Sequence, residues 1–235
     1  MEENYEIEKL SLMERLKYFF INPGKVFEQY IEKPTVFVKT AIMAIVTIIS
    51  AVVTSMHKDA IINEIMKVYQ GKNLPAQTIE ATKNIESIML SAPVLIILGI
   101  LMLAATMAFM SLIYWGLTSA FKGTITFGQT VAVYTLAYMP KIVQTIFVII
   151  RSLATNSFAA LSKTGTQTYI TTITSVVNIF SIWQIVLLVI GLAKVGKISK
   201  KKSAIIVIII TAICLAITLG SFALGKASTS MLKTQ

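Results

Sequence analysis

Long uncharged apolar runs dominate this 235-residue sequence and decide what it can fold into. A helix needs about 20 mostly apolar residues to cross the hydrocarbon core of a bilayer. Five segments meet this requirement, at about residues 35–56, 92–117, 127–150, 175–193 and 203–224. The composition agrees, because 55% hydrophobic and 14% charged residues differ strongly from the about 45–50% and about 25% of soluble domains. We therefore expect an all-α polytopic membrane protein, a bundle of five transmembrane helices.

The N-terminal segment, residues 1–33, is expected to contain two short amphipathic helices. Ser11 followed by Glu14 forms a capping-box pattern, and Asn22-Pro23 pairs a cap residue with a proline at the first helical position. The apolar sides of these helices either lie on the inner membrane surface, open to a cytoplasmic partner, or pack under the bundle. Amphipathicity alone does not separate the two interpretations, because lipid and protein both cover apolar faces.

The membrane domain is expected to span residues 34–225. Within it, residues 57–90 have apolar positions at helical spacing on both sides of a turn signal at residues 71–75, which predicts an extracytoplasmic helical hairpin. The hairpin either gates a substrate cavity or covers polar span ends. Residues 226–235 are expected to form a disordered tail.

A basic cluster between the last two spans predicts the orientation, because Lys and Arg near span ends favour the cytoplasmic side. The cluster consists of Lys197, Lys200, Lys201 and Lys202. It predicts a multi-pass protein of the cell membrane with a cytoplasmic N-terminus and an extracytoplasmic C-terminus. The cluster is also expected to contact anionic lipids, although topogenic anchoring alone explains it. It is short and lacks interleaved aromatic residues, so nucleic-acid binding is not expected.

Catalytic and metal-binding residue types are scarce in the chain. All 11 acidic residues lie at or before Glu86, and the chain has one His, His57, and one Cys, Cys214. Zinc needs at least three protein ligands, and a catalytic His needs a nucleophile and an orienting group. The chain also lacks the glycine-rich motifs that hold nucleotide phosphates. We therefore expect no enzymatic activity, no cofactor and no metal.

Lys141 is the residue that composition leaves unexplained, because it falls near the middle of the third span, directly after Pro140. An intramembrane lysine usually faces a bundle interior or a wet cavity. Three interpretations are open: solvation by tyrosine hydroxyls and carbonyls freed at Pro140, binding of an anionic ligand or lipid headgroup, or pairing with a carboxylate of another chain. The predicted intramembrane polar site comprises Tyr134, Tyr138, Lys141, Gln144, Asn178, Trp183 and Gln184.

Two further features concern helix packing. Trp183 lies at the centre of the fourth span, where its indole N–H requires a partner, and helix packing with one interhelical hydrogen bond is the expected role. Ala212, Ala216 and Gly220 recur every four residues along the fifth span. Such a ridge of small residues lets another helix approach closely, either within the chain or in a homo-oligomer.

Three short motifs give the chain a family resemblance. They are Phe20-Ile-Asn-Pro-Gly-Lys-Val-Phe27, Ala137-Tyr-Met-Pro140, and Asn178-Ile-Phe-Ser-Ile-Trp-Gln184 followed by Gly191-Leu192. With the five-span count, they resemble the bacterial branch of the Yip1 domain family over about residues 17–224. The eukaryotic members resemble trafficking factors that engage prenylated Rab-type GTPases, but this chain lacks their Asp-Leu-Tyr-Gly-Pro motif. Some bacterial relatives are similar to accessory membrane subunits that help assemble ABC-type exporters.

Two classes of function follow from these observations. The first is a non-enzymatic membrane scaffold or assembly factor that binds the bilayer and other membrane proteins, with exporter subunits implied by the resemblance. The second is a transporter or channel. Because ion-coupled antiporters ordinarily place Asp or Glu within the membrane, the second class is left mainly with neutral or anionic solutes.

Overall fold

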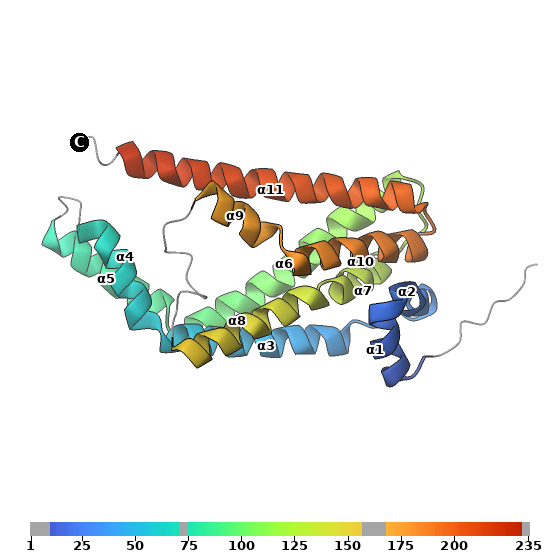
Figure 1. Cartoon of the computed structure of the whole chain (residues 1–235), viewed down its shortest axis with the longest axis horizontal. Helices are drawn as coiled ribbons and strands as arrows, with labels where there is room; N and C mark the ends of the chain where they lie inside the picture. The colour runs from blue at the N-terminus through green and yellow to red at the C-terminus, as the bar shows by residue number, and fades with distance from the viewer. Residues whose placement is uncertain (1–9, 71–74, 157–167, 232–235) are drawn as a thin grey trace, which may run out of the picture. The chain divides into compact units, whose positions relative to one another are not determined.

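The computed structural model describes residues 10–70, 75–156 and 168–231. Within these residues the regular structure is helical, as Figure 1 shows. The helices, in chain order, are α1 (Leu12–Ile21), α2 (Pro23–Glu32), α3 (Phe37–Met56), α4 (Lys58–Gln70), α5 (Ala76–Met89), α6 (Ala92–Ala120), α7 (Phe127–Ala137), α8 (Met139–Thr155), α9 (Tyr169–Val176), α10 (Ile179–Val195) and α11 (Lys200–Met231).

Four helical segments are long and apolar enough to cross a membrane: α3, α6, α7 with α8, and most of α11. The bent pair of α9 and α10 makes a fifth span if the two helices are counted together. The all-helical, multi-pass prediction is therefore confirmed, with four or five spans.

The expected fourth span is not one straight helix. It breaks at Val177 and Asn178, between α9 and α10. Val177 has an extended backbone, and the Asn178 side-chain amide donates to the carbonyl oxygen of Ser175 at 3.0 Å. Asn side chains compete with helical backbone bonds in this way, which is why the helix ends there.

Pro140 predicts an interruption of the third span, and the structure has one slightly earlier in the chain. The structure separates α7 from α8 at Tyr138 rather than at Pro140 and Lys141. Pro140 lies in the first turn of α8, where its missing N–H leaves no helical bond unmade. Together, the two helices are still long and apolar enough to form a single span, residues 127–155.

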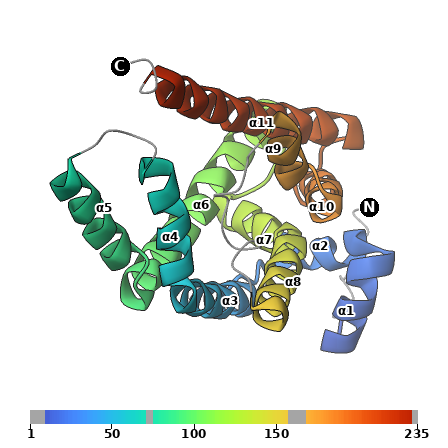
Figure 2. The ribbon, with the colours of Figure 1, turned by 60° about the vertical axis from the view of Figure 1, so that its left-hand side comes forward.

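The chain divides into two compact units. The first unit consists of Met1–Ala41, Ala105–Lys141 and Ile179–Ala212. The second unit consists of Ile42–Ala104, Ile142–Asn178 and Ile213–Gln235. In the first unit, Phe27, Val133 and Leu192 are fully buried and mark a core shared by α2, α7 and α10. In the second unit, α4 and α5 contact each other as neighbouring helices (Figure 2). In the same unit, the rings of Tyr169 on α9 and Phe222 on α11 have centroids 5.0 Å apart.

Outside the spans, the structure agrees with only some of the expectations from the sequence. Two N-terminal helices form, at the expected places. Helices α4 and α5 form within residues 57–90, while most of the predicted turn, residues 71–74, lies outside the described residues and the side of the membrane stays a prediction. Helix α11 continues to Met231, past the expected start of the tail at residue 226, and the disorder of the tail stays a prediction.

Candidate functional site

Residues at the helix ends determine where the two N-terminal helices, α1 and α2, begin and end. Ser11 caps α1, since its hydroxyl accepts from the Glu14 N–H at 3.3 Å while the Glu14 carboxylate accepts from the Ser11 N–H at 2.8 Å. The backbone and hydroxyl hydrogen bonds from Ser11 lower the pKa of Glu14. Asn22 ends α1, and Pro23 then begins α2 at its first helical position. We call α1 and α2 together, residues 12–32, the platform.

Helix α2 is docked on α10 and α7 through a buried aromatic ring. Phe27 has no exposed surface. A Cβ atom added to Gly191 of α10 would lie 2.8 Å from Phe27 Cε1 and 2.6 Å from Val133 Cγ1. Only a glycine leaves this space, so Gly191 forms the slot that Phe27 fills. Both residues belong to the motifs that carry the family resemblance.

Polar contacts around the buried face of α2 also hold this helix in place. Lys194 at the end of α10 pairs with Glu28 at 2.5 Å, and the Gln129 side-chain amide donates to the Ile31 carbonyl at 2.8 Å. Lys39 donates to the Tyr30 hydroxyl at 2.9 Å. Burial raises the pKa of Tyr30 to about 12, so its phenol stays neutral at physiological pH. Helix α2 is thus an integral part of the first unit.

Helix α1 is held more lightly, by aromatic contacts. The rings of Phe19 and Phe20 each lie 5.3 Å from the Trp183 ring of α10, between centroids. Lys25 of α2 lies 4.7 Å from the centroid of the Tyr18 ring. Trp183 therefore packs on the N-terminal helix through its ring, while the expected interhelical hydrogen bond of its indole N–H stays a prediction.

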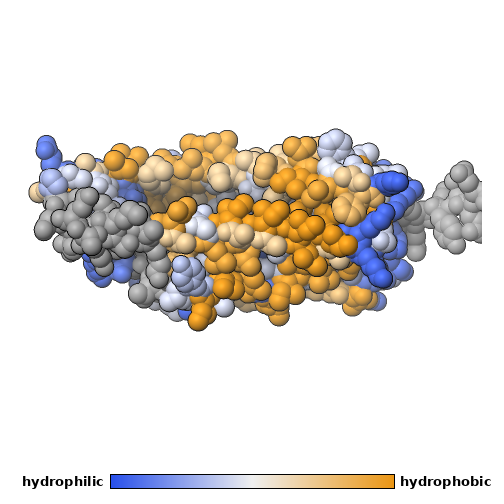
Figure 3. Space-filling view, turned by 90° about the horizontal axis from the view of Figure 1, so that it is seen from above, coloured by the Kyte–Doolittle hydropathy of each residue, from blue (hydrophilic) through white to orange (hydrophobic). Residues whose placement is uncertain are grey.

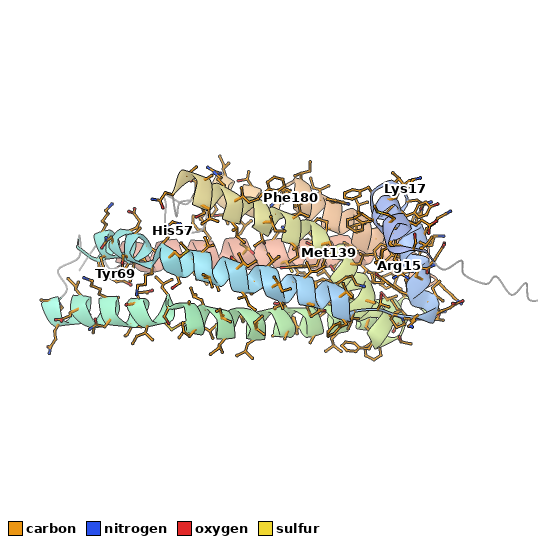
Figure 4. The ribbon with its side chains drawn as sticks, turned by 90° about the horizontal axis from the view of Figure 1, so that it is seen from below. Arg15, Lys17, His57, Tyr69, Met139 and Phe180 are labelled. Carbon is orange, nitrogen blue, oxygen red and sulfur yellow. The ribbon has the colours of Figure 1, made fainter. Side chains whose placement is uncertain are left out.

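Of the two alternatives for the amphipathic helices, packing under the bundle applies to α2. The apolar face of α2 packs under the bundle, with Val26, Phe27 and Tyr30 buried. No residue of α1 is buried, and its apolar side chains other than Phe19 stay exposed. Arg15 and Lys17 also lie on α1 (Figure 4).

The basic cluster lies beside the platform in the same unit. The Thr124 N–H donates to the Gly196 carbonyl at 3.0 Å, and Lys202 donates to the Phe121 carbonyl at 3.3 Å. These bonds join the α6–α7 and α10–α11 connections, while the pair of Lys194 and Glu28 joins them to α2. Figure 3 shows hydrophilic atoms gathered at the end of the view where α11 begins.

The structure brings part of the predicted intramembrane polar site together. Tyr134 and Tyr138 have ring centroids 6.0 Å apart, and the Tyr114 ring of α6 lies 5.8 Å from that of Tyr134. Lys141 donates to the Ser181 hydroxyl of α10 at 2.5 Å. Sequence reasoning missed Tyr114 and Ser181, because contacts between helices leave no local pattern.

For the remaining residues of the predicted polar site, the structure shows positions and contacts on their own helices. Gln144 follows Lys141 by about one turn on α8, and Asn178 bonds within the α9–α10 break. Gln184 is half-buried on α10, next to Trp183. Among the described residues, no group of three or more His, Cys, Asp and Glu side chains is arranged to hold a metal ion.

Lys141→Met tests whether the charge of the lysine matters, since methionine keeps much of the length and removes the ammonium group. A lysine at mid-membrane raises the free energy of membrane insertion by about 2.5–3.5 kcal/mol on insertion scales. Its presence in the third span therefore implies an interaction that offsets this cost. We expect complexes with partners to be recovered less well, with insertion unchanged, as measured by affinity purification from membranes. A variant that is more stable and fully active would show a merely tolerated polar residue.

The small-residue ridge of α11 lies on an outer face. Ala212, Ala216 and Gly220 are all exposed, and a Cβ atom added to Gly220 would meet no atom within 4 Å. Packing within the described part of the chain therefore does not account for the ridge.

Ala216→Leu is expected to weaken any homo-oligomer formed through the ridge, because the larger side chain separates closely packed helices. Light scattering of the detergent-solubilised protein would measure the change in mass. Cys214→Leu adds bulk at an exposed position on another face of α11 and should leave the mass unchanged. Equal behaviour of the two variants would exclude the ridge as an interface.

Comparison with known protein families identifies the family of the chain. A family model described as the Yip1 domain matches residues 17–222. The chain belongs to the Yip1 domain family. The matched part of this Yip1 domain begins in α1 and ends in α11, so it includes the Phe27 slot, Trp183 and Lys141. No curated protein and no solved structure matches the chain significantly.

Proposed function

We propose that this Yip1 domain protein, of the bacterial branch of the family, is a non-enzymatic membrane scaffold or assembly factor. It binds other membrane proteins, with exporter subunits as the proposed class, through the platform and the region around Lys141. The observation that carries the proposal is the docking of α2 in the Gly191 slot, which holds a second, exposed helix in a fixed place. A fixed, exposed helix suits recognition, because little conformational freedom is lost on binding.

The distribution of reactive residues supports a binding role. No Asp or Glu follows Glu86, so most of the membrane domain has no carboxylate for acid–base chemistry. His57 lies between α3 and α4, where its Nε2 atom is buried with no hydrogen-bond partner among the described residues. A catalytic histidine would instead be oriented by one group and face a nucleophile with the other nitrogen.

Site-directed deletion tests this function. Removing residues 2–21 deletes α1 but keeps Asn22 and α2, so the slot contacts of Phe27 remain. Chemical crosslinking in native membranes, followed by mass spectrometry, is expected to recover specific membrane-protein partners from the full chain. The deletion should reduce that recovery much more than it reduces the amount of inserted protein. Equal recovery from both chains would remove α1 from the proposed interface.

A transporter or channel for a neutral or anionic solute is the second proposal. It is favoured by the breaks at Tyr138 and at residues 177–178, since discontinuous helices form substrate sites in many transporters. Purified protein in liposomes distinguishes the two functions. A scaffold moves no solute above the leakage of empty vesicles, whereas saturable uptake would establish the transporter.

We further propose a cytoplasmic N-terminus and an extracytoplasmic C-terminus in the cell membrane, because the basic cluster and the platform lie together in one unit. Single cysteines at Gln70 and Ser199, in a Cys214→Ala background, test the orientation. An impermeant thiol reagent applied to intact cells should label the first and spare the second. Labelling of Ser199→Cys from outside would reverse the orientation.

A further inference from the structure

One side of α1 carries a stripe of apolar side chains that the first unit leaves largely exposed. Their exposed fractions are 85% for Leu12, 79% for Met13, 59% for Leu16 and 62% for Phe20. At 3.6 residues per turn these four positions fall within about 100° of the helix circumference, so they form one face. We call these four residues the α1 stripe. A contiguous exposed apolar face marks a surface that something else covers.

The ring contacts with Trp183 fix the depth of α1 relative to the membrane-crossing helix. Trp183 precedes Lys194 by about three turns of α10, or about 16 Å. Because Phe19 and Phe20 reach Trp183, the C-terminal end of α1 lies on the apolar side of the basic end of α10. This places α1 at the boundary between headgroups and acyl chains, the depth at which amphipathic in-plane helices lie.

The charge around the stripe specifies the kind of lipid. The platform contributes Arg15, Lys17 and Lys25, and residues 194–202 contribute a second group of lysines in the same unit. The described acidic residues of this unit are Glu14, Glu28 and Glu32, and Glu28 is paired with Lys194. The excess of positive charge is complementary to a leaflet that contains anionic phospholipids.

We propose that α1 is an in-plane membrane helix, whose apolar stripe is buried among the acyl chains of an anionic leaflet while its basic residues meet the lipid phosphates. The proposal goes beyond the scaffold function and does not depend on any protein partner. It leaves the polar flank of α1, which carries Lys17, as the side of the platform open to proteins.

Fluorescence quenching in vesicles tests the proposal with the full chain. Leu12→Cys lies on the stripe, and Lys17→Cys, on the polar flank about 90° from the centre of the stripe, is the matched control. Each is made in a Cys214→Ala background and labelled with an environment-sensitive fluorophore. The variants are reconstituted in phosphatidylcholine alone or with phosphatidylglycerol. Quenchers are acyl-chain nitroxide lipids from the membrane side and iodide from the water side.

The label at Leu12 is expected to be blue-shifted and to lose most of its emission to nitroxide lipids, whereas iodide quenches mainly the label at Lys17. The nitroxide effect should be larger with phosphatidylglycerol and should weaken at high salt, because the headgroup attraction is screened. Equal quenching in the two lipid mixtures would overturn the preference for anionic lipid. Iodide quenching of Leu12 as strong as that of Lys17 would overturn burial in lipid and assign the stripe to a protein partner.

These vesicles contain no other protein, so the result is separate from the scaffold function. Loss of partner recovery in native membranes bears on that function, and quenching in purified vesicles bears on the lipid-bound helix.

Discussion

Phe27→Ala is expected to release the platform from the first unit. Phe27 is fully buried, and replacing a buried phenylalanine by alanine typically costs about 3–5 kcal/mol through lost burial and the cavity left behind. The loss should be concentrated in α2, because the ring fills the slot at Gly191 rather than the interior of a span. Limited trypsin digestion in detergent, with cleavage after Lys25 of α2, would measure the release as faster cutting, because the enzyme needs the helix to open around this bond.

Phe37→Ala is the matched control for this substitution. Phe37 is 85% exposed at the start of α3, so the same change should shift the free energy of unfolding by no more than about 0.5 kcal/mol. Similar protease sensitivity of the two variants would contradict the docking of α2 through Phe27.

Gly191→Ala is expected to destabilise the protein although alanine is the better helix former. The new methyl group would meet Val133 and Phe27 at 2.6 and 2.8 Å, inside normal contact distance. Overpacking of this kind costs about 1–3 kcal/mol, which exceeds the gain of about 1 kcal/mol that alanine brings to a helix interior. Thermal unfolding followed by circular dichroism should show a lower midpoint.

The opposite sign is expected for Gly116→Ala in α6. A Cβ atom at Gly116 would meet no atom within 4 Å, so only the helix-propensity gain remains. A lower midpoint for both variants would indicate that the spans tolerate neither change for reasons unrelated to the slot. A raised midpoint for Gly191→Ala would contradict the close approach of α2 and α10.

Local chemistry made much of the fold predictable. The capping box at Ser11, the proline at the start of α2 and the long apolar runs all act within a few turns of helix, and the structure contains the elements they predict. The break before α10 was not predicted, because Asn178 sits in an uncharged run and its effect depends on a single side-chain bond.

The docking contacts depend on residues far apart in the chain. Phe27 and Gly191 are separated by most of the sequence, and neither has a neighbour that indicates the pairing. For the same reason the sequence left open which amphipathic helix would pack under the bundle. It also identified Lys141 as unusual without indicating Ser181, because the two residues meet only when α8 and α10 pack.

Site-specific photocrosslinking at Lys17 in native membranes tests the central claim most directly. A photoreactive residue at this exposed position should form a discrete adduct with another membrane protein, and the adduct should disappear when Phe27→Ala releases the platform. The same residue at Glu80, exposed on α5 in the second unit, is the control and should not form that adduct. Absence of a protein adduct at Lys17, or an adduct that forms equally well in the Phe27→Ala chain, would contradict the scaffold account.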